Sequence, residues 1–176
     1  IARAANDSIE MGVSAFALSV IETKTFGNTQ DSVNLKTAQT YLEQAIDVNP
    51  EYQAAYEELK YRMDYAWFLQ RHGLVGRTTP EEQLQICKRN MYKWPLTPRA
   101  LHSIQQRYAK TYSIYISHKY SDEASIAIID STIAATDPND HFELYDLYLI
   151  KINIYQNLKN YKGVSDAFEQ MSYHFV

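Results

Sequence analysis

The chain has 176 residues, enough to bury a sizeable core, and 45% of them are hydrophobic, which excludes an intrinsically disordered chain. Its single cysteine excludes an internal disulfide and favours a reducing compartment, so we expect a cytoplasmic protein. No apolar run is long enough to span a bilayer, which excludes a membrane span. The chain starts at Ile1, from which we expect a fragment of a longer protein.

The sparse glycines and prolines, five of each, favour long helices over many short strands. Apolar residues recur at helical spacing in eight segments, which predicts an all-α fold. Short connections join neighbouring segments, so we expect four antiparallel helix pairs in a single domain covering 1–176. The pairs are predicted near residues 5–48, 51–94, 98–136 and 140–174.

The first pair begins with a helix predicted from about Ala5 to Lys24, with an apolar stripe formed by Ile9, Val13, Phe16 and Val20. Gly27 and Asn28 are expected to end it. A long loop is then expected as far as Asn34, the predicted N-cap of the second helix. One face of that second helix carries Ala38, Leu42, Ala45 and Ile46, and Asn49-Pro50 is expected to stop it.

Two later helices begin with strong start signals. Thr79, Pro80 and Glu82 have the spacing of a capping box with proline at the first helical position. The helix that follows is expected to bury Leu84, Cys87, Met91 and Trp94, and Thr97-Pro98 repeats the cap-plus-proline signal for the fifth helix. A sixth helix is predicted to bury a stripe of Ala124, Ile128, Ser131 and Ala135.

The spacing of small, aliphatic and aromatic residues in the first two pairs resembles the tetratricopeptide (TPR) repeat. The residues that carry the resemblance are Ala38, Leu42, Ala45, Ile46, Pro50, Tyr52, Ala55, Tyr56 and Leu59. A second match covers Tyr148, Tyr155, Tyr161, Val164 and Phe168. The resemblance implies a TPR-like α-solenoid whose groove holds an extended peptide or a carboxylate end.

The same nine residues, together with a long first helix and an extended loop, also resemble the helical-repeat domain attached to winged-helix DNA-binding domains in some bacterial transcription activators. That resemblance implies a sensory or regulatory domain that binds a small molecule or peptide. A deep pocket lined by tyrosines would favour this alternative, whereas an open basic groove would favour a protein-interaction module.

Charge is strongly segregated along the chain. Residues 83–121, here called the basic interval, contain no acidic residue and seven lysines and arginines, while both flanks are acidic. Aromatic residues interleave with these cations. We therefore predict a partner-binding groove between the fourth and fifth helices, for a protein or an acidic peptide, formed by Lys88, Arg89, Tyr92, Lys93, Arg107, Tyr108, Lys110 and Tyr112.

Three alternatives bear on this interpretation. The basic interval could be a solvated face that balances its acidic neighbours, or it could bind a phosphate backbone, although the acidic flanks disfavour nucleic acid. An enzyme finds no support, because no phosphate-cradling loop, H-E-x-x-H or G-x-S-x-G motif occurs. The five histidines form no metal-ligand spacing, so we expect no catalytic residue, metal or cofactor.

The C-terminal segment is unusually apolar for the end of a solenoid, whose last helix is normally polar on its outer face. Its apolar residues are Phe168, Met171, Tyr173, Phe175 and Val176. We expect a continuation of the chain, a homo-oligomer contact or a docked partner at this end.

Overall fold

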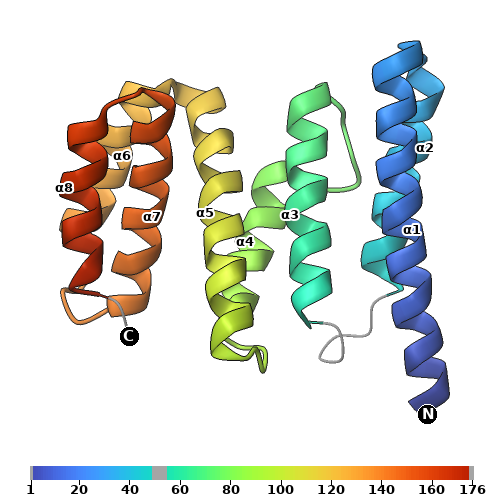
Figure 1. The fold of residues 1–176 in the computed structure, drawn as a ribbon, viewed down its shortest axis with the longest axis horizontal. Coiled ribbons are helices and arrows are strands. Elements are labelled where there is room, and N and C mark those ends of the chain that lie inside the picture. The colour runs from blue at the N-terminus through green and yellow to red at the C-terminus, as the bar shows by residue number, and fades with distance from the viewer. Residues whose placement is uncertain (1, 49–54, 175–176) are drawn as a thin grey trace. The chain divides into compact units, whose positions relative to one another are not determined.

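The computed structural model describes residues 2–48 and 55–174, and this part of the chain contains eight α-helices and no strand (Figure 1). The helices are α1 (Ala2–Thr29), α2 (Ser32–Asp47), α3 (Ala55–His72), α4 (Pro80–Met91), α5 (Pro98–Tyr120), α6 (Asp122–Ala135), α7 (His141–Asn157) and α8 (Tyr161–Ser172). The all-α fold class is therefore confirmed. None of these helices is both long enough and apolar enough to cross a bilayer.

The chain divides into two compact units, Ile1–Ile104 (unit 1) and Gln105–Val176 (unit 2), with the boundary inside α5. Each unit is described by itself. In unit 1, α2 packs against both α1 and α3, and α3 packs against α4. In unit 2, α7 packs against both α6 and α8. The four-pair solenoid and the single domain remain predictions.

The core of unit 1 is formed where α1, α2 and α3 meet. Its buried residues are Ala15, Leu35, Ala38, Leu42, Ala45, Ile46, Tyr61, Tyr65, Phe68 and Leu69. All four residues predicted on the inner face of α2 are among them, which confirms that part of the pattern. Ala38 and Ala45 are completely buried, and their small side chains allow the neighbouring helices to approach closely.

The predicted long loop after the first helix is wrong. The helix continues through Gly27 and Asn28 to Thr29, and only two residues separate it from α2. Gln30 adopts a left-handed conformation with φ of 58°, which ends α1. Asp31 is the N-cap of α2, because its side chain accepts a hydrogen bond from the Val33 amide at 2.9 Å.

The predicted apolar stripe of the first helix is also displaced. Val13 and Val20 are exposed, whereas Ala15 and Ser19 are buried. Apolar residues occur on almost every side of this helix, so their spacing does not identify one inner face. The small side chains make the close contact, and the larger ones lie beside it.

The capping box of α4 is confirmed in full. The Thr79 hydroxyl accepts from the Glu82 amide at 3.2 Å, and the Glu82 carboxylate accepts from the Thr79 amide at 2.7 Å. Pro80 is the first helical residue. The predicted inner face of this helix is buried as well, and it comprises Leu84, Cys87, Met91 and Trp94.

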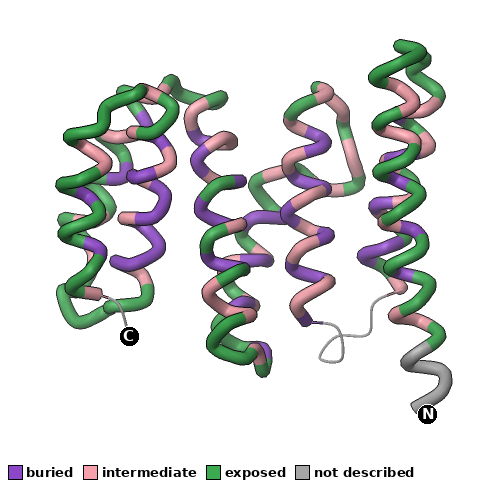
Figure 2. The backbone as a smooth tube through the Cα atoms, in the orientation of Figure 1, coloured by how far each residue is buried: buried purple, intermediate pink, exposed green. Residues whose placement is uncertain are grey.

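In unit 2, α7 is buried along most of its length because helices pack on two of its sides (Figure 2). The approach of α8 to α7 depends on Gly163. A Cβ atom at this position would lie 2.9 Å from atoms of the Tyr155 ring, closer than such atoms pack. Ala167 and Met171 complete the buried side of α8.

The predicted inner stripe of the sixth helix is wrong. Its four residues are exposed, namely Ala124, Ile128, Ser131 and Ala135. The residues buried on α6 are Ser125 and Ile129, each one position further along than a predicted neighbour. Since one residue turns a helix by about 100°, the true face is rotated by that amount. This segment is apolar at most positions, so its pattern holds little directional information.

The structure does not test every prediction made for residues 49–54 and for the C-terminal end. The stop at Asn49-Pro50 and the residue Tyr52 lie outside the described residues, as do Phe175 and Val176. At the end of α8, Phe168 and Tyr173 are exposed. The expected continuation of the chain, homo-oligomer contact or docked partner at this end remains a prediction.

The capping box yields a first test. Replacing Thr79 with Ala removes the side chain that satisfies the Glu82 amide, so we expect the free energy of unfolding to fall by about 1 kcal/mol. Urea denaturation followed by circular dichroism measures this loss. The matched control is Thr40→Ala on the exposed side of α2, where the hydroxyl donates only to the Lys36 carbonyl of its own helix. The control should lose nothing, and an equal loss in both variants would contradict the capping role.

The α7–α8 contact yields a second test. Gly163→Ala should lower the free energy of unfolding by about 1–3 kcal/mol, because the new methyl group overlaps the Tyr155 ring. Gly27→Ala is the matched control, since a Cβ there meets no atom within 4 Å and alanine favours the helix. Thermal unfolding should therefore move in opposite directions for the two variants. A stabilised Gly163→Ala variant would show that α8 does not depend on this close approach.

Candidate functional site

The eight residues of the predicted groove lie in both compact units. Unit 1 contains Lys88 and Arg89 in the last turn of α4, followed by Tyr92 and Lys93. Unit 2 contains the other four, Arg107, Tyr108, Lys110 and Tyr112, all on α5. The geometry of each half is therefore considered separately.

The unit 1 half projects from the end of α4. Arg89 and Lys93 are exposed, while Trp94 is buried and holds the end of the segment against the unit. The ammonium group of Lys88 lies 5.5 Å from the centre of the Tyr92 ring, within the range of a cation–π contact. This half therefore presents exposed positive charge beside a partly exposed aromatic ring.

The unit 2 half contains a ladder of tyrosines along one side of α5. The rings of Tyr108 and Tyr112 stack at 5.7 Å, and those of Tyr112 and Tyr115 lie 6.0 Å apart. Tyr108 is buried, so the accessible part of the ladder is Tyr112 and Tyr115. Lys119 extends the ladder by donating to the Tyr115 hydroxyl at 3.3 Å. Exposed Lys110 completes this half.

The eight residues predicted for the groove did not include Tyr115 and Lys119. The spacing of Tyr108, Tyr112, Tyr115 and Lys119 is the signal that could have found them, because residues three and four apart share a helix face.

Unit 1 also contains an apolar cavity that the sequence did not predict. It has a volume of about 330 Å³ and is lined by Phe16, Ser19, Val20, Thr23, Lys24, Leu42, Asp64, Trp67 and Phe68. These residues come from α1, α2 and α3. The walls are mainly aromatic and aliphatic, and a few polar groups accompany them, as in small-molecule sites.

Two cations outside the lining lie over aromatic rings that contribute to the cavity. The ammonium group of Lys60 is 4.6 Å from the centre of the Phe16 ring. The guanidinium of Arg71 is 5.1 Å from the centre of the Trp67 ring. Contacts of this kind keep the charge of a long side chain close to an apolar surface.

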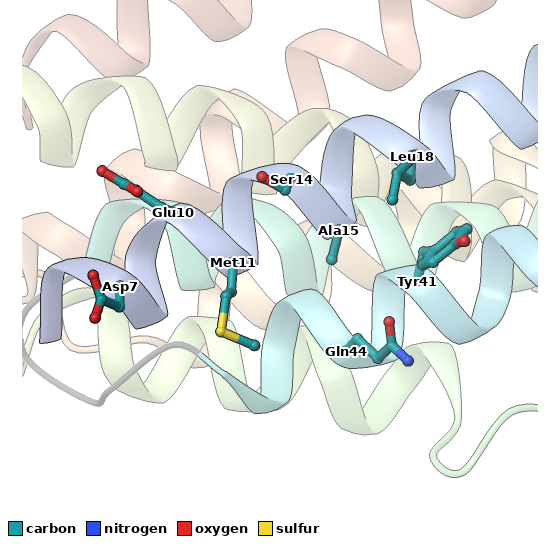
Figure 3. Close-up of a pocket in the computed structure, with 8 residues that line it drawn as sticks. All are labelled: Asp7, Glu10, Met11, Ser14, Ala15, Leu18, Tyr41 and Gln44. Atoms are coloured by element: carbon teal, nitrogen blue, oxygen red, sulfur yellow. The ribbon is translucent and has the colours of Figure 1, made fainter. Parts of the chain in front are cut away.

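A second hollow lies between α1 and α2 (Figure 3). Its volume is about 470 Å³, and its lining comprises Asp7, Glu10, Met11, Ser14, Ala15, Leu18, Tyr41 and Gln44. Met11 extends from α1 toward α2, whereas the carboxylate of Glu10 points away from α2 (Figure 3). Met11 and Leu18 are exposed. The hollow therefore has the character of an open surface depression.

A polar network fastens the segment between α3 and α4 onto α2. Tyr65 donates its hydroxyl hydrogen to Glu43, and Arg77 pairs with Glu43 at 3.0 Å and with Asp47 at 2.9 Å. Burial, followed by the hydrogen bond to Glu43, raises the pKa of Tyr65 to about 12. A Cβ atom at Gly76 would overlap the Tyr65 hydroxyl, so the backbone there must lack a side chain.

A second polar cluster joins α3 to the start of α4. Arg62 donates to Glu58 at 2.8 Å and to the Gln83 side-chain oxygen at 3.0 Å. Gln83 in turn donates to the Thr78 hydroxyl at 2.6 Å. In both networks the charged groups hold helices together, and their partners are other groups of the same unit.

The thiol and imidazole groups of unit 1 are arranged for packing. Burial raises the pKa of the Cys87 thiol, and its sulfur lies 3.6 Å from the Leu59 carbonyl oxygen. His72 lies between Phe26 and Phe68, at ring distances of 5.7 and 4.9 Å. Burial, and then the neighbouring Arg71, lower the pKa of His72. Among the residues that the structure describes, no group of three His, Cys, Asp or Glu side chains is placed to hold a metal ion.

Comparisons of the chain with protein-family models, with curated proteins and with solved structures give no match. The resemblance to TPR repeats therefore stays a prediction made from the residues alone.

The surroundings of His72 predict a pH dependence of stability. Because its pKa lies below the usual 6.5 in the folded state, the unfolded chain binds a proton first as the pH falls. The free energy of unfolding should therefore decrease as the pH drops below about 6.5. In His72→Gln this part of the decrease should vanish, as measured by urea titrations at pH 7 and pH 5.

The control for this test is His118→Gln, which removes an exposed histidine from α5. It should keep the pH dependence of the parent chain. An identical decrease in all three proteins would show that the aromatic surroundings of His72 do not penalise its charged form.

Proposed function

We propose that this chain is a protein-interaction module that captures an acidic peptide or an acidic segment of a partner protein through the basic interval. The observation that carries the proposal is the exposed positive charge of Arg89, Lys93 and Lys110 within a stretch that contains no acidic residue. Arg62, Arg77 and Lys151, which form ion pairs inside the units, all lie outside this stretch. Positive charge that is exposed in this way favours encounter with an acidic partner.

The tyrosines support the same proposal. Tyr92 accompanies the cations of unit 1, and Tyr112 and Tyr115 accompany those of unit 2. Tyrosine supplies a large contact area at a low cost in conformational entropy, and its hydroxyl can bond to peptide groups. Basic and tyrosine-rich surfaces therefore provide both attraction and contact for a peptide.

The proposal includes the architecture that the sequence resembles. We propose a TPR-like α-solenoid of helix pairs, acting without catalysis and without a cofactor in the cytoplasm. The exposed Phe168 and Tyr173 support a further contact at α8, for which a second copy of the chain is the proposed partner. Nucleic acid is disfavoured by the acidic residues on both sides of the basic interval.

A regulatory domain that responds to a small molecule is the second candidate function. The cavity between α1, α2 and α3 supports it, since its size and aromatic walls suit a small ligand. A deep pocket lined by tyrosines was the feature that would favour this alternative, whereas phenylalanine and tryptophan line this cavity.

Charge reversal tests the first proposal. We expect the variant with Glu at positions 89, 93, 107 and 110 to bind a fluorescein-labelled peptide of Glu, Asp and Tyr more weakly by at least about tenfold, or ~1.4 kcal/mol. Fluorescence anisotropy measures the affinity. Parent binding should also weaken as salt is added, because charges at a surface are screened. Thermal unfolding of the variant checks that the helices are retained.

Two further variants make this test specific. Arg89→Glu with Lys93→Glu changes only exposed side chains of unit 1 and should lose part of the affinity. Lys36→Glu with Lys162→Glu makes the same change of charge on exposed positions of α2 and α8, and should bind as the parent does. Equal affinity in all variants would refute the proposal. Stronger binding to single-stranded RNA than to the peptide would support the nucleic-acid alternative instead.

A further inference from the structure

The cavity of unit 1, here called the slot, is lined by residues of α1, α2 and α3, and two aromatic contacts also join α1 to α3. The ring of Phe16, which lines the slot, stacks on that of Tyr61 at 4.8 Å. Further along α1, Phe26 meets His72 edge to face at 5.7 Å. Phe16 and Phe26 are ten residues apart, so these two contacts lie about 15 Å apart along the helix. Leu42 of α2 contributes to the lining of the slot.

The interior of the slot favours an apolar body over a polar one. The Ser19 hydroxyl donates to the Phe16 carbonyl at 2.6 Å, and the Thr23 hydroxyl donates to the Ser19 carbonyl at 2.8 Å. Both hydroxyl hydrogens are thus used within α1. A ligand in contact with these walls gains most from apolar surface, which packs against Val20, Trp67 and other lining side chains.

Three cations are in the lining of the slot or lie over its aromatic rings. Lys24 lines it, Lys60 lies over the Phe16 ring and Arg71 lies over the Trp67 ring. Asp64 is the acidic residue in the lining. Lys24 is in the lining and Arg71 lies over the ring of Trp67, another lining residue, and both cations are exposed. An anionic group at the slot would be attracted by their positive charge.

We propose that this slot binds a small amphipathic anion, namely a molecule with an unbranched or aromatic apolar body and one carboxylate. The body lies between Phe16 and Trp67, and the carboxylate lies toward Lys24 and Arg71. The volume of about 330 Å³ is at the lower end of the range of about 300–1,000 Å³ typical of small-molecule sites. The inference rests on the second candidate function and names its class of ligand.

Three matched probes test this site. Sodium decanoate, decan-1-ol and decylamine share an alkyl chain and differ in the charge of the head group. The chain has two tryptophans, so Trp94→Phe leaves Trp67, in the wall of the slot, as the reporter of binding. We expect its fluorescence to change on addition of decanoate, with an affinity at least about tenfold above those of the alcohol and the amine.

Variants locate the ligand within the slot. Lys24→Gln with Arg71→Gln should weaken decanoate binding by about tenfold and leave decan-1-ol binding unchanged. Lys36→Gln, on an exposed position of α2, should change neither. Val20→Phe places a larger side chain at the lining and should block all binding while keeping the thermal unfolding temperature.

The outcomes separate this inference from the function on which it rests. No binding of decanoate, equal affinity for the three probes, or full binding by Val20→Phe would each overturn the site. Decanoate binding that changes the affinity for the acidic peptide supports both the site and the regulatory function. Decanoate binding that leaves that affinity unchanged supports the site and contradicts the regulatory function.

Discussion

Close packing of small side chains is the constraint on which unit 1 depends. Ala15, Ala38 and Ala45 belong to one buried cluster, and two of them have no exposed surface. When helices meet on such residues, their larger neighbours cannot also lie in the contact and must pack beside it. Phe16 and Val20 are displaced in this way, and together with Trp67 they form the walls of the cavity. The ligand slot is thus a result of how α1 and α2 fit together.

The sequence predicted the helices better than the faces they bury. The inner face of α2 and the capping box at Thr79 were predicted correctly. Polar residues on the other sides of α2 leave only one apolar face, and the Thr79–Glu82 spacing fits only a helix start. The faces of α1 and α6 were wrong, because apolar residues on nearly every side give no direction. The cavity could not be predicted at all, since it depends on contacts between residues far apart in the chain. The cations of the basic interval, by contrast, can be read directly from the sequence, and five of the seven are exposed.

Cations serve three different purposes in this chain, according to what surrounds them. Arg62 and Arg77 are surrounded by carboxylates and amides, and they fasten one helix to the next. Lys60 and Arg71 lie over the aromatic rings of Phe16 and Trp67, which line the cavity. The exposed cations of the basic interval create a positive potential at the surface, which can attract an acidic partner. The small net charge of the chain does not reveal these three different roles of its lysines and arginines.

Gly76 has a consequence that extends beyond its own loop. Because a side chain there would occupy the position of the Tyr65 hydroxyl, any other residue would displace the ring and separate it from Glu43. Glu43 also receives Arg77, so the disturbance would reach the ion pairs that tie the loop to α2. A single methyl group in a surface connection would then loosen two helices at once. The contact between α2 and α3 through Tyr65 and Glu43 therefore depends on the absence of a side chain at Gly76.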